Sequence, residues 1–477
     1  MIYIIAAFYS ADFKLKDLDS RCFEVIDKIV DKHGIQIIDE VTWGKIPGES
    51  KKNLVNVIII KDPSISNEER MSAIDIDNTN DSCFFANEAE LFEFISIHPQ
   101  DNYYVIGCDS LYTQFIPISS FIYTLQFSGK GPGATQDGAR WPIEKGFRNF
   151  RIISYSKWLK NGSEEKYRII QYEDNVNKAE HGEYNYLRLM KKIFETGNTR
   201  PDRTKVGTIS IFAPRIEFDI RDSIPLITTK FVAWKSILKE LIFFLKGQTD
   251  TKILEEQGVN IWKGNTSHDF LKDRGLSHYE QGDIGPMYGW LLRHIGAKYN
   301  GCSADYTDPE NTGMDQLEIL IKGLKEDPFS RRHLLTTYCP LYTDQGVLAP
   351  CHGIVVQFYC EYHEVDGMLL SCHVYLRSSD TFLGQPYNIA SYAMLTYIIA
   401  KMINAKPERL IISMGDCHIY KTHEFACKLQ LTRTPLPFPI FTVSDEVCSK
   451  TFDDLSMDDF DVIGYLSHPP IKAPMAI

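Results

Sequence analysis

The chain has 477 residues, 44% of them apolar and 24% charged, an ordinary globular mixture that predicts two or three domains at about 100–200 residues each. Its net charge of −12 excludes a uniformly basic surface for nucleic-acid backbones. The 11 cysteines are odd in number and form no C-x-x-C pair, so we expect a reducing cytoplasm and no secreted disulfide framework.

The amino-terminal region alternates short apolar runs with helical segments. We predict strands at Ile2–Ala7, Val55–Lys61 and Tyr103–Ile106, with helices at 19–31 and 88–97. The first run lacks the basic residues and the cleavage site of a signal peptide, so it is interpreted as a buried strand. No apolar run reaches about 18 residues, and no membrane span is expected. The strand–helix rhythm predicts an α/β domain.

A closing strand pair and a linker follow. Phe150–Ser154 and Tyr167–Gln171 predict two antiparallel strands. The stretch Glu173–Glu183 is rich in charge and poor in apolar residues, which is typical of a linker. The predicted parts are a first domain at residues 1–175, a linker at 176–183 and a second domain at 184–477.

Two helices stand out in the second region. Trp234–Gly247 places its apolar residues on one face at helical spacing, and Gly247 is a suitable residue for its carboxyl end. Asn388–Ala405 is the second helix, and it stops before Pro407 because the residue ahead of a proline disfavours helical geometry. Both predictions describe buried, core-forming helices.

A β-hairpin is predicted between these helices. Gly353–Cys360 and Leu369–Tyr375 read as its strands, joined by a turn at Asp366-Gly367. Because the strands are antiparallel, we expect Cys351 and Arg377 to emerge from the same end of the sheet.

Cys351 is the candidate nucleophile. It lies at a strand end, where loops expose side chains, and the preceding Pro350 restricts the backbone. Arg377 is expected at the same edge, and a nearby cation lowers the pKa of a thiol and favours the nucleophilic thiolate. Most cysteines are small buried apolar residues, so these features together carry the prediction.

A metal site is the competing interpretation of this segment. Several cysteines and histidines cluster here: Cys351, His352, Cys360, His363, Cys372 and His373. Their spacings do not match paired zinc ligands, and strand alternation would point several to opposite faces. We therefore expect no metal.

Five residues are candidate anion ligands. Arg203 follows Pro201-Asp202, Arg331 and Arg332 follow a Pro-Phe-Ser turn, and Arg377 precedes Ser378. Each arginine alone reads as a solvated surface residue. Together with a hydroxyl they predict a forked site for a phosphate dianion.

Glu240 is the candidate acid or base. It lies at the edge of the apolar face of the helix Trp234–Gly247. Most glutamates in such places point to solvent. If Glu240 turns inward it requires hydrogen bonds, and burial raises its pKa toward that of a general acid or base.

The second region resembles thymidylate synthase over nearly all of residues 184–477. The matching segments, in chain order, are DRTKVGTISIF, PLITTK, KELIFFLKG, DIGPMYG, DPFSRRHLL, LAPCHGIVVQFY, LRSSDTFLGQPYNIASY, GDCHIY and GYLSHPPIKAPMAI. The resemblance implies an α+β synthase fold and the methylation of dUMP with 5,10-methylenetetrahydrofolate as co-substrate.

The resemblance also implies roles for single residues. Cys351 is expected to attack C6 of dUMP, Tyr288 to help remove the C5 proton, and Glu240 to organise water and proton transfers. Asn388 is expected to recognise the uracil amide edge, where an aspartate would suit a dCMP hydroxymethylase. The implied dUMP ligands are Arg203, Arg331, Arg332, His352, Arg377, Ser378, Asp380, Asn388, His418 and Tyr420. The implied folate ligands are Trp262, Asn265, Asp380 and Ile477.

The family pattern implies a homodimer as well, because Arg331 and Arg332 resemble arginines that reach the neighbouring subunit's site. The sequence departs from the pattern at a few positions. Leu376 stands in place of Gln, Tyr338-Cys339 in place of Trp-Asn, and Tyr387 in place of Phe. These departures bear on positioning and affinity, not on the reaction class.

Residues 1–175 resemble dihydrofolate reductase more weakly. The matching segments are Ile4–Ala7, Thr42-Trp43, Ile46-Pro47, Val105–Gly107, Leu111-Tyr112 and Tyr167–Glu173. The resemblance implies a mixed sheet with flanking helices and, in a bifunctional fusion, reduction of dihydrofolate with NADPH.

The nucleotide-binding features of that family are altered here. The segment between Ala7 and Phe23 is too short for the loop that covers the nicotinamide, and Asp19 reads equally well as a helix-start residue or as the catalytic acid. Asp39–Thr42 places acids where Gly-Arg-x-Thr binds the cofactor phosphates, and Gly107-Cys108 replaces paired glycines.

We therefore expect a retained fold with weak or no reductase activity. The alternatives are a fully bifunctional enzyme and a first domain that acts only as a scaffold or interaction module. An RNA-binding role has no support from the acidic net charge.

Overall fold

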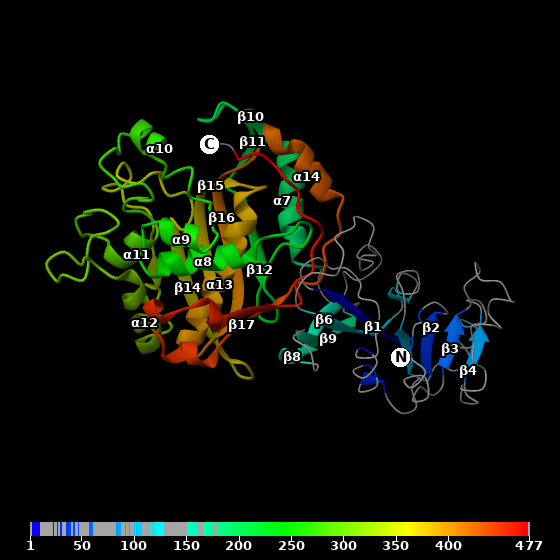
Figure 1. The fold of residues 1–477 in the computed structure, drawn as a ribbon. Helices are drawn as coiled ribbons and strands as arrows, with labels where there is room; N and C mark the ends of the chain where they lie inside the picture. The colour runs from blue at the N-terminus through cyan, green and yellow to red at the C-terminus, as the bar shows by residue number, and fades with distance from the viewer. Residues whose placement is uncertain are drawn as a thin grey trace. The chain divides into compact units, whose positions relative to one another are not determined.

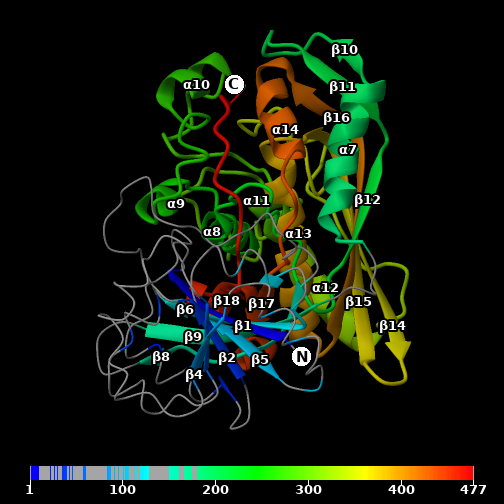
Figure 2. The ribbon, with the colours of Figure 1, turned by 90° about the vertical axis from the view of Figure 1, so that its right-hand side faces the viewer.

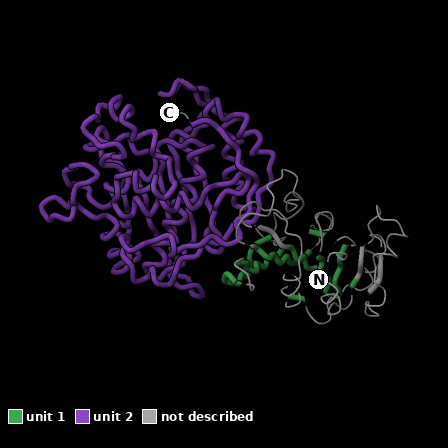
Figure 3. The backbone as a smooth tube through the Cα atoms, in the orientation of Figure 1, with its two compact units in different colours: residues 1–179 green, residues 180–477 purple. Residues whose placement is uncertain are grey.

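The computed structural model divides the chain into two compact units, residues 1–179 (unit 1) and 180–477 (unit 2) (Figure 3). Unit 2 is described from residue 180 to 475. The residues described in unit 1 are 2–9, 22, 26, 29–30, 35–39, 42, 46, 57–60, 83–86, 91, 95, 100, 102–106, 112, 115–116, 119–127, 150–160 and 166–174.

Unit 1 contains a mixed sheet in the order β4-β3-β2-β5-β1-β6-β9-β7, with β8 paired to β9. The run from β4 to β6 is parallel, and β9 is antiparallel to β6, β7 and β8. The strands are β1 (Ile2–Tyr9), β2 (Ile35–Asp39), β3 (Val57–Ile60), β4 (Cys83–Ala86), β5 (Tyr103–Ile106), β6 (Phe121–Phe127), β7 (Phe150–Tyr155), β8 (Leu159–Lys160) and β9 (Lys166–Asp174).

The strands of this sheet are rich in apolar residues, which explains why they are buried. Ile4, Ile38 and Ile106 are fully buried, as expected of parallel strands that are covered on both faces. The three predicted strands and the closing antiparallel pair are confirmed. The predicted helices at 19–31 and 88–97 lie mostly outside the described residues.

Unit 2 is an α+β unit built on a seven-stranded sheet in the order β10-β11-β16-β15-β14-β13, with β12 also paired to β16. Its sheet strands are β10 (Asn198–Arg200), β11 (Thr208–Phe212), β12 (Arg215–Asp219), β13 (Leu334–Leu335), β14 (Val355–His363), β15 (Gly367–Asp380) and β16 (Lys406–Tyr420). A separate pair is formed by β17 (Ile440–Val443) and β18 (Phe460–Ile463).

Unit 2 also contains α-helices and short 3-10 helices. The α-helices are α7 (Glu183–Thr196), α8 (Trp234–Leu245), α9 (Lys252–Glu256), α10 (His268–Asp273), α11 (Gly289–His294), α12 (Gln316–Glu326), α13 (Gly384–Met402) and α14 (Glu424–Leu431). The 3-10 helices are η4 (Lys421–His423), η5 (Asp445–Ser449), η6 (Phe452–Asp454) and η7 (Met457–Asp459). Among the described residues, none of the helices is both long and apolar enough to cross a bilayer.

Helix α13 is the centre of the unit 2 core. It packs on β15, β16 and α8 (Figures 1 and 2). Ile389, Ala393 and Ile398 are fully buried, and α13 carries apolar residues on all of its faces, which is typical of a core helix. Helix α13 thus begins close to the carboxyl end of β15 in the sequence and continues into the core of the unit.

Helix α8 confirms one predicted helix, since it ends at Leu245 and is followed by Gly247 with a φ of 70°. The predicted start of the other helix is wrong, because α13 begins at Gly384 and not at Asn388. Pro386 lies in its first turn, where the missing N–H is harmless because these groups have no partner inside the helix.

The predicted hairpin is confirmed, since β14 pairs with β15 in antiparallel register from Val355↔Tyr375 to His363↔Gly367. The next strand, β16, is parallel to β15. The carboxyl ends of β15 and β16 and the loop before β14 therefore share one edge of the sheet, which we call the site edge.

Candidate active site

Arg377 holds the loop that carries Cys351 at the site edge. Its backbone N–H donates to the Cys351 carbonyl oxygen at 3.0 Å. Its side chain donates from Nε to the Pro350 carbonyl at 2.7 Å and from Nη2 to the Ala349 carbonyl at 2.9 Å. The expectation that Cys351 and Arg377 emerge from the same end of the hairpin is confirmed.

Cys351 lies against the hydroxyl group of Tyr288. The cysteine N–H donates to Tyr288 Oη at 3.1 Å, and its Sγ lies 3.6 Å from the same oxygen. The Tyr288 ring stacks on His352 with centroids 4.4 Å apart. Tyr288 also has a φ of 42°. Such a conformation costs a non-glycine residue about 1–3 kcal/mol and is found preferentially at functional sites.

Burial sets the resting state of the sulfur, because it raises the pKa of the Cys351 thiol. The hydrogen bond with Tyr288 and the positive charge of Arg377 lower that pKa, but by less than burial raises it. The expected effect of Arg377 is present and is outweighed, so the thiol is the resting form. His352 is neutral, since burial lowers its pKa to about 4, and its Nδ1 lies 2.8 Å from Tyr392 Oη.

A carboxyl group and an indole form the second part of the site. Glu240, on α8, accepts a hydrogen bond from Trp262 Nε1 at 2.7 Å. Burial raises the pKa of Glu240 to about 7, and the Trp262 hydrogen bond opposes only part of that rise. A carboxyl group in this state exchanges protons near neutral pH. The Trp262 and Tyr288 rings lie 6.0 Å apart, so the two parts adjoin.

Comparison with protein families agrees with this geometry, because the family model for thymidylate synthase matches residues 184–477. The chain belongs to the thymidylate synthase family. The matched segment contains each of the dUMP and folate ligands predicted from the sequence.

Single relatives lead to the same family. The chain is 44% identical to a thymidylate synthase of Saccharomyces cerevisiae over 64% of its length and 99% of the relative. It is 42% identical to one of human herpesvirus 8, over 65% of the chain and 88% of the relative. A bifunctional dihydrofolate reductase-thymidylate synthase of Leishmania major is 41% identical over 62% of the chain and 56% of the relative. The resemblance to the bifunctional proteins is thus confirmed, through alignments about as long as unit 2.

The synthase unit brings the predicted phosphate and ribose residues to the site edge. In the β15–β16 ladder Ser378 pairs with Asp416, and Asp380 pairs with His418. The His418 and Tyr420 rings lie 5.0 Å apart. His418 Nδ1 lies 2.9 Å from Asp416 Oδ1, so the carboxylate orients the imidazole.

Arg203 joins this group from the loop between β10 and β11. The loop is ordered by Asp202, which accepts hydrogen bonds from the N–H groups of Thr204 at 2.8 Å and Gly207 at 2.6 Å. Residue 208 then pairs with Tyr420. The side chain of Arg203 is exposed, so its guanidinium is available to an anion.

Asp380 is held at the end of β15. Its Oδ1 accepts hydrogen bonds from the N–H groups of Phe382 at 3.0 Å and Leu383 at 3.3 Å. The fully buried His423 lies 3.7 Å away through Nδ1, and its Nε2 lies 2.7 Å from the carbonyl oxygen of Pro474. Sequence reasoning missed His423, for which no local pattern gave a signal.

Asn388 lies, half-buried, in the second turn of α13. Its amide makes no side-chain hydrogen bond to the described part of the chain. Burial raises the pKa of the neighbouring Tyr387, and the charge of Glu240 adds to the rise. Helix α13 packs on α8, which carries Glu240. Leu376, the departure beside the phosphate arginine, is fully buried and offers no hydrogen bond.

Four predicted residues make no contact with this cluster that the structure describes. Arg331 and Arg332 are exposed after α12, and within the described residues of one chain they make no side-chain contact with the Cys351 group. Asn265 is half-buried three residues after Trp262. Ile477 lies outside the described residues. Within residues 180–475 and the described part of unit 1, no three His, Cys, Asp or Glu residues are grouped to hold a metal ion.

Proposed function

We propose that unit 2 converts dUMP to dTMP by reductive methylation, with 5,10-methylenetetrahydrofolate as co-substrate and dihydrofolate as second product. The observation that carries this proposal is the juxtaposition of the Cys351 thiol with the Tyr288 hydroxyl, at 3.6 Å, beside the Glu240–Trp262 pair. A nucleophile, a phenol hydroxyl beside it and a carboxyl group with a pKa of about 7 suit the addition of sulfur to a pyrimidine followed by proton removal.

Cys351 begins the reaction by losing its proton and attacking C6 of the uracil, which leaves an enolate at C4–C5. The enolate carbon C5 forms a bond to the one-carbon unit. Tyr288 assists removal of the C5 proton, and the folate nitrogen then leaves the one-carbon unit, which becomes an exocyclic methylene group that can accept hydride. The folate supplies both this unit and the hydride that completes the methyl group. Loss of the Cys351 sulfur from C6 restores the double bond.

The bound nucleotide is held by residues of the site edge. Arg203, Arg377 and Ser378 bind the phosphate, which compensates the dianion with two guanidinium groups. His418 and Tyr420 contact the ribose. The Asn388 amide, which has no partner in the described chain, donates to and accepts from the uracil edge. His352 and Asp380 complete the nucleotide site, while Asp380, Trp262, Asn265 and Ile477 face the folate.

Arg331 and Arg332 act in the site of a second subunit, so the working enzyme is a homodimer. Their exposure within one chain is consistent with this role. Mixing a Cys351→Ser chain with an Arg331→Ala chain should restore activity, because one of the two mixed sites then has both residues intact. Mixtures that stay as inactive as the two parents would rule out arginine sharing.

The direct test of the proposed reaction is tritium release from 5-tritiated dUMP in the presence of the folate. Cys351→Ser should lower release by roughly a thousandfold or more, because a serine hydroxyl is almost fully protonated at neutral pH. Binding of dUMP should persist, since the phosphate ligands remain. Wild-type turnover in the mutant would refute the proposal.

Unit 1 retains a reductase-like fold, in our proposal, without effective reductase chemistry. Asp39 ends β2 and accepts a hydrogen bond from the Thr42 N–H at 2.9 Å, while its second carboxylate oxygen is buried and has no hydrogen-bond partner among the described residues. The cation of the Gly-Arg-x-Thr pattern corresponds to Glu40, which lies outside the described residues, and a carboxylate at that position repels a cofactor phosphate. Asp19, Gly107 and Cys108 lie outside the described residues. A reductase that uses NADPH and a pure scaffold are the alternatives.

We also propose a cytoplasmic enzyme whose two domains are joined by the linker at 176–183. Within residues 180–475 no disulfide bond joins the cysteines, which is typical of reducing compartments. The test compares activity without added reductant, which should persist, with activity after oxidation, which should be lost. This comparison shows whether Cys351 must stay reduced.

A further inference from the structure

Arg293 is a largely buried charge that the proposed reaction does not use. It lies near the end of the short helix α11, and Tyr288 immediately precedes the start of that helix. Only 16% of the Arg293 side chain is exposed. Burial of a guanidinium is unfavourable unless its N–H groups are matched by acceptors, so its partners indicate what it holds together.

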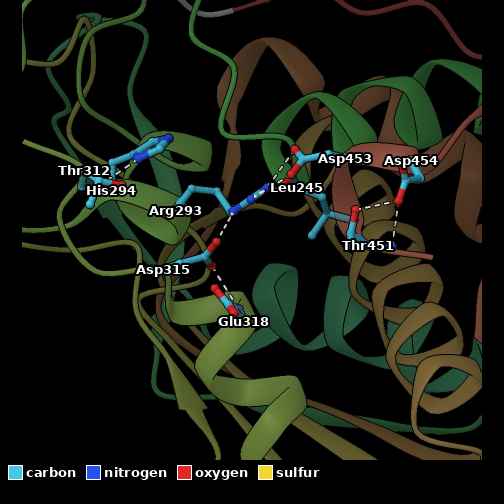
Figure 4. Close-up of polar contacts among 9 residues, drawn as sticks. All are labelled: Leu245, Arg293, His294, Thr312, Asp315, Glu318, Thr451, Asp453 and Asp454. Atoms are coloured by element: carbon cyan, nitrogen blue, oxygen red, sulfur yellow. Dashed lines mark hydrogen bonds and ion pairs between the residues drawn. The ribbon is translucent and has the colours of Figure 1, made fainter. Parts of the chain in front are cut away.

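The Arg293 guanidinium connects three separate segments (Figure 4). Its Nε donates to Asp315 Oδ2 at 2.6 Å, at the start of α12. Its Nη1 donates to the carbonyl oxygen of Leu245 at 2.9 Å, at the end of α8. Nη1 and Nη2 also contact the two carboxylate oxygens of Asp453 at 3.1 and 3.0 Å. This two-pronged geometry is specific to arginine.

Both carboxylate partners are themselves fixed. Asp315 accepts the Glu318 N–H through Oδ1 at 2.9 Å and so caps α12. Asp453 belongs to η6, where Thr451 donates from its N–H and its hydroxyl to Asp454, at 3.0 and 2.7 Å. Arg293 therefore binds segments that are held in place by their own capping hydrogen bonds, and its bonds to them restrict the movement of α11.

The other end of α11 meets α8 directly. A Cβ at Gly289 would lie 2.6 Å from the Phe244 carbonyl oxygen, so only glycine permits this approach of the two backbones. Helix α8 carries Glu240, five residues before Leu245, whose carbonyl Arg293 binds. The two helices that hold Glu240 and Tyr288 are thus joined at both ends of α11, by a backbone contact and by the guanidinium.

We propose that Arg293 is a positioning residue for this site: by tying the last turn of α11 to the end of α8, it holds Tyr288 against Cys351. The strained backbone of Tyr288, with a φ of 42°, requires such support, since residues in rare conformations persist only where their surroundings determine them. The proposal rests on the proposed methylation of dUMP and adds a residue that contacts neither substrate.

The test uses the full chain with Arg293→Lys and Asp453→Asn. Lysine keeps the charge but cannot bind Asp315, Leu245 and Asp453 together. We expect kcat to fall by about 10- to 100-fold in Arg293→Lys, as a small misplacement of a reacting group does, and less in Asp453→Asn. Equilibrium binding of dUMP should stay within about threefold of wild type, because the phosphate ligands are untouched.

The decisive readout is the tritium isotope effect, obtained by comparing tritium release with dTMP formation from 5-tritiated dUMP. It should increase in Arg293→Lys, because a displaced Tyr288 makes removal of the C5 proton slower relative to the other steps. Arg433→Lys is the matched control, because Arg433 likewise connects distant segments, through the carbonyl groups of Thr229 at 2.8 Å and Pro469 at 2.7 Å. It should lower the melting temperature and leave the isotope effect unchanged.

A purely structural role would give a lower melting temperature with kcat and the isotope effect at wild-type values, and would overturn the proposal. A loss of dUMP affinity in proportion to kcat would overturn it as well, since the whole site would then be distorted. If Arg293→Lys does not fold, Asp453→Asn alone must show the increased isotope effect. A wild-type chain that releases no tritium would instead contradict the proposed function, before any variant is compared.

Discussion

Both units place polar residues at the carboxyl ends of parallel strands, but these ends differ in chemistry. In unit 2, β15 ends at Asp380 beside Arg377 and Ser378, and β16 ends at Tyr420. In unit 1, β2 ends at Asp39, whose carboxylate accepts a backbone N–H. The site edge of unit 2 therefore carries guanidinium and hydroxyl groups that suit an anion, whereas β2 ends in a buried carboxylate that binds a backbone N–H.

The difference shows that a parallel sheet supplies a place for a ligand and not the ligand chemistry. The described core of unit 1 consists largely of buried isoleucines and tyrosines, which a covered sheet requires whatever it binds. The identity of these core residues does not depend on whether the ends of the strands bind a nucleotide. A domain can accordingly keep its sheet after its binding groups have changed, and only the edge residues indicate which state applies.

The largest expected contrast is between two assays of the full chain. With dihydrofolate and NADPH, we expect oxidation of NADPH to stay at background, because Glu40 replaces the arginine that binds the cofactor phosphates in the reductase pattern. The same preparation should release tritium from 5-tritiated dUMP, which controls for folding. NADPH oxidation at a rate comparable to tritium release would remove the contrast and establish a bifunctional enzyme.

Glu240→Gln sharpens the comparison within unit 2. We expect kcat to fall roughly 100-fold or more, as when a general acid or base is removed. The limb of the wild-type pH profile that reflects the Glu240 pKa of about 7 should disappear. An unchanged profile would assign that limb to another group.

Stability gives an independent check on Glu240. Its pKa is raised from 4.5 to about 7 in the folded chain, so the folded state binds a proton more tightly than the unfolded state. The contribution of Glu240 to the free energy of unfolding should therefore be largest below pH 4.5 and should fall as the pH rises through about 7. In Glu240→Gln the melting temperature should lose this part of its pH dependence.

Much of the site edge was predictable from the sequence, for local reasons. Asp366-Gly367 between two apolar runs predicts a hairpin, and antiparallel geometry then brings Cys351 and Arg377 together. The start of α13 was not predicted, because Pro386 reads as a helix breaker although it is tolerated in a first turn.

The remaining site residues depend on contacts between distant segments, which no local pattern encodes. Arg293 contacts residues 22, 48 and 160 positions away along the chain. His423 lies next to Asp380 and Pro474 through tertiary packing alone. Asp416 had a partial signal, because it stands two residues before His418 in the segment GDCHIY, where alternate strand residues share a face.

Asp416 carries the smallest expected effect. It accepts a hydrogen bond from Arg200 at 2.6 Å through Oδ2, while its Oδ1 lies 2.9 Å from His418. Arg200 stands at the start of the loop that bears Arg203, so the ion pair links the phosphate and ribose parts of the edge. The two side chains are 59% and 32% exposed, and pairs this exposed contribute about 0.2–1 kcal/mol.

Arg200→Ala should therefore raise the KM for dUMP by no more than about fivefold and leave kcat unchanged, because the pair helps to arrange the binding groups and not the reacting ones. The difference from wild type should shrink as salt is added, since exposed charges are screened. Arg215→Ala is the control, because Arg215 forms a similarly exposed pair with Glu217 at 2.6 Å, on the neighbouring strand β12. A fall in kcat in Arg200→Ala would show instead that the loop influences the chemical step, and that the site edge works as one unit.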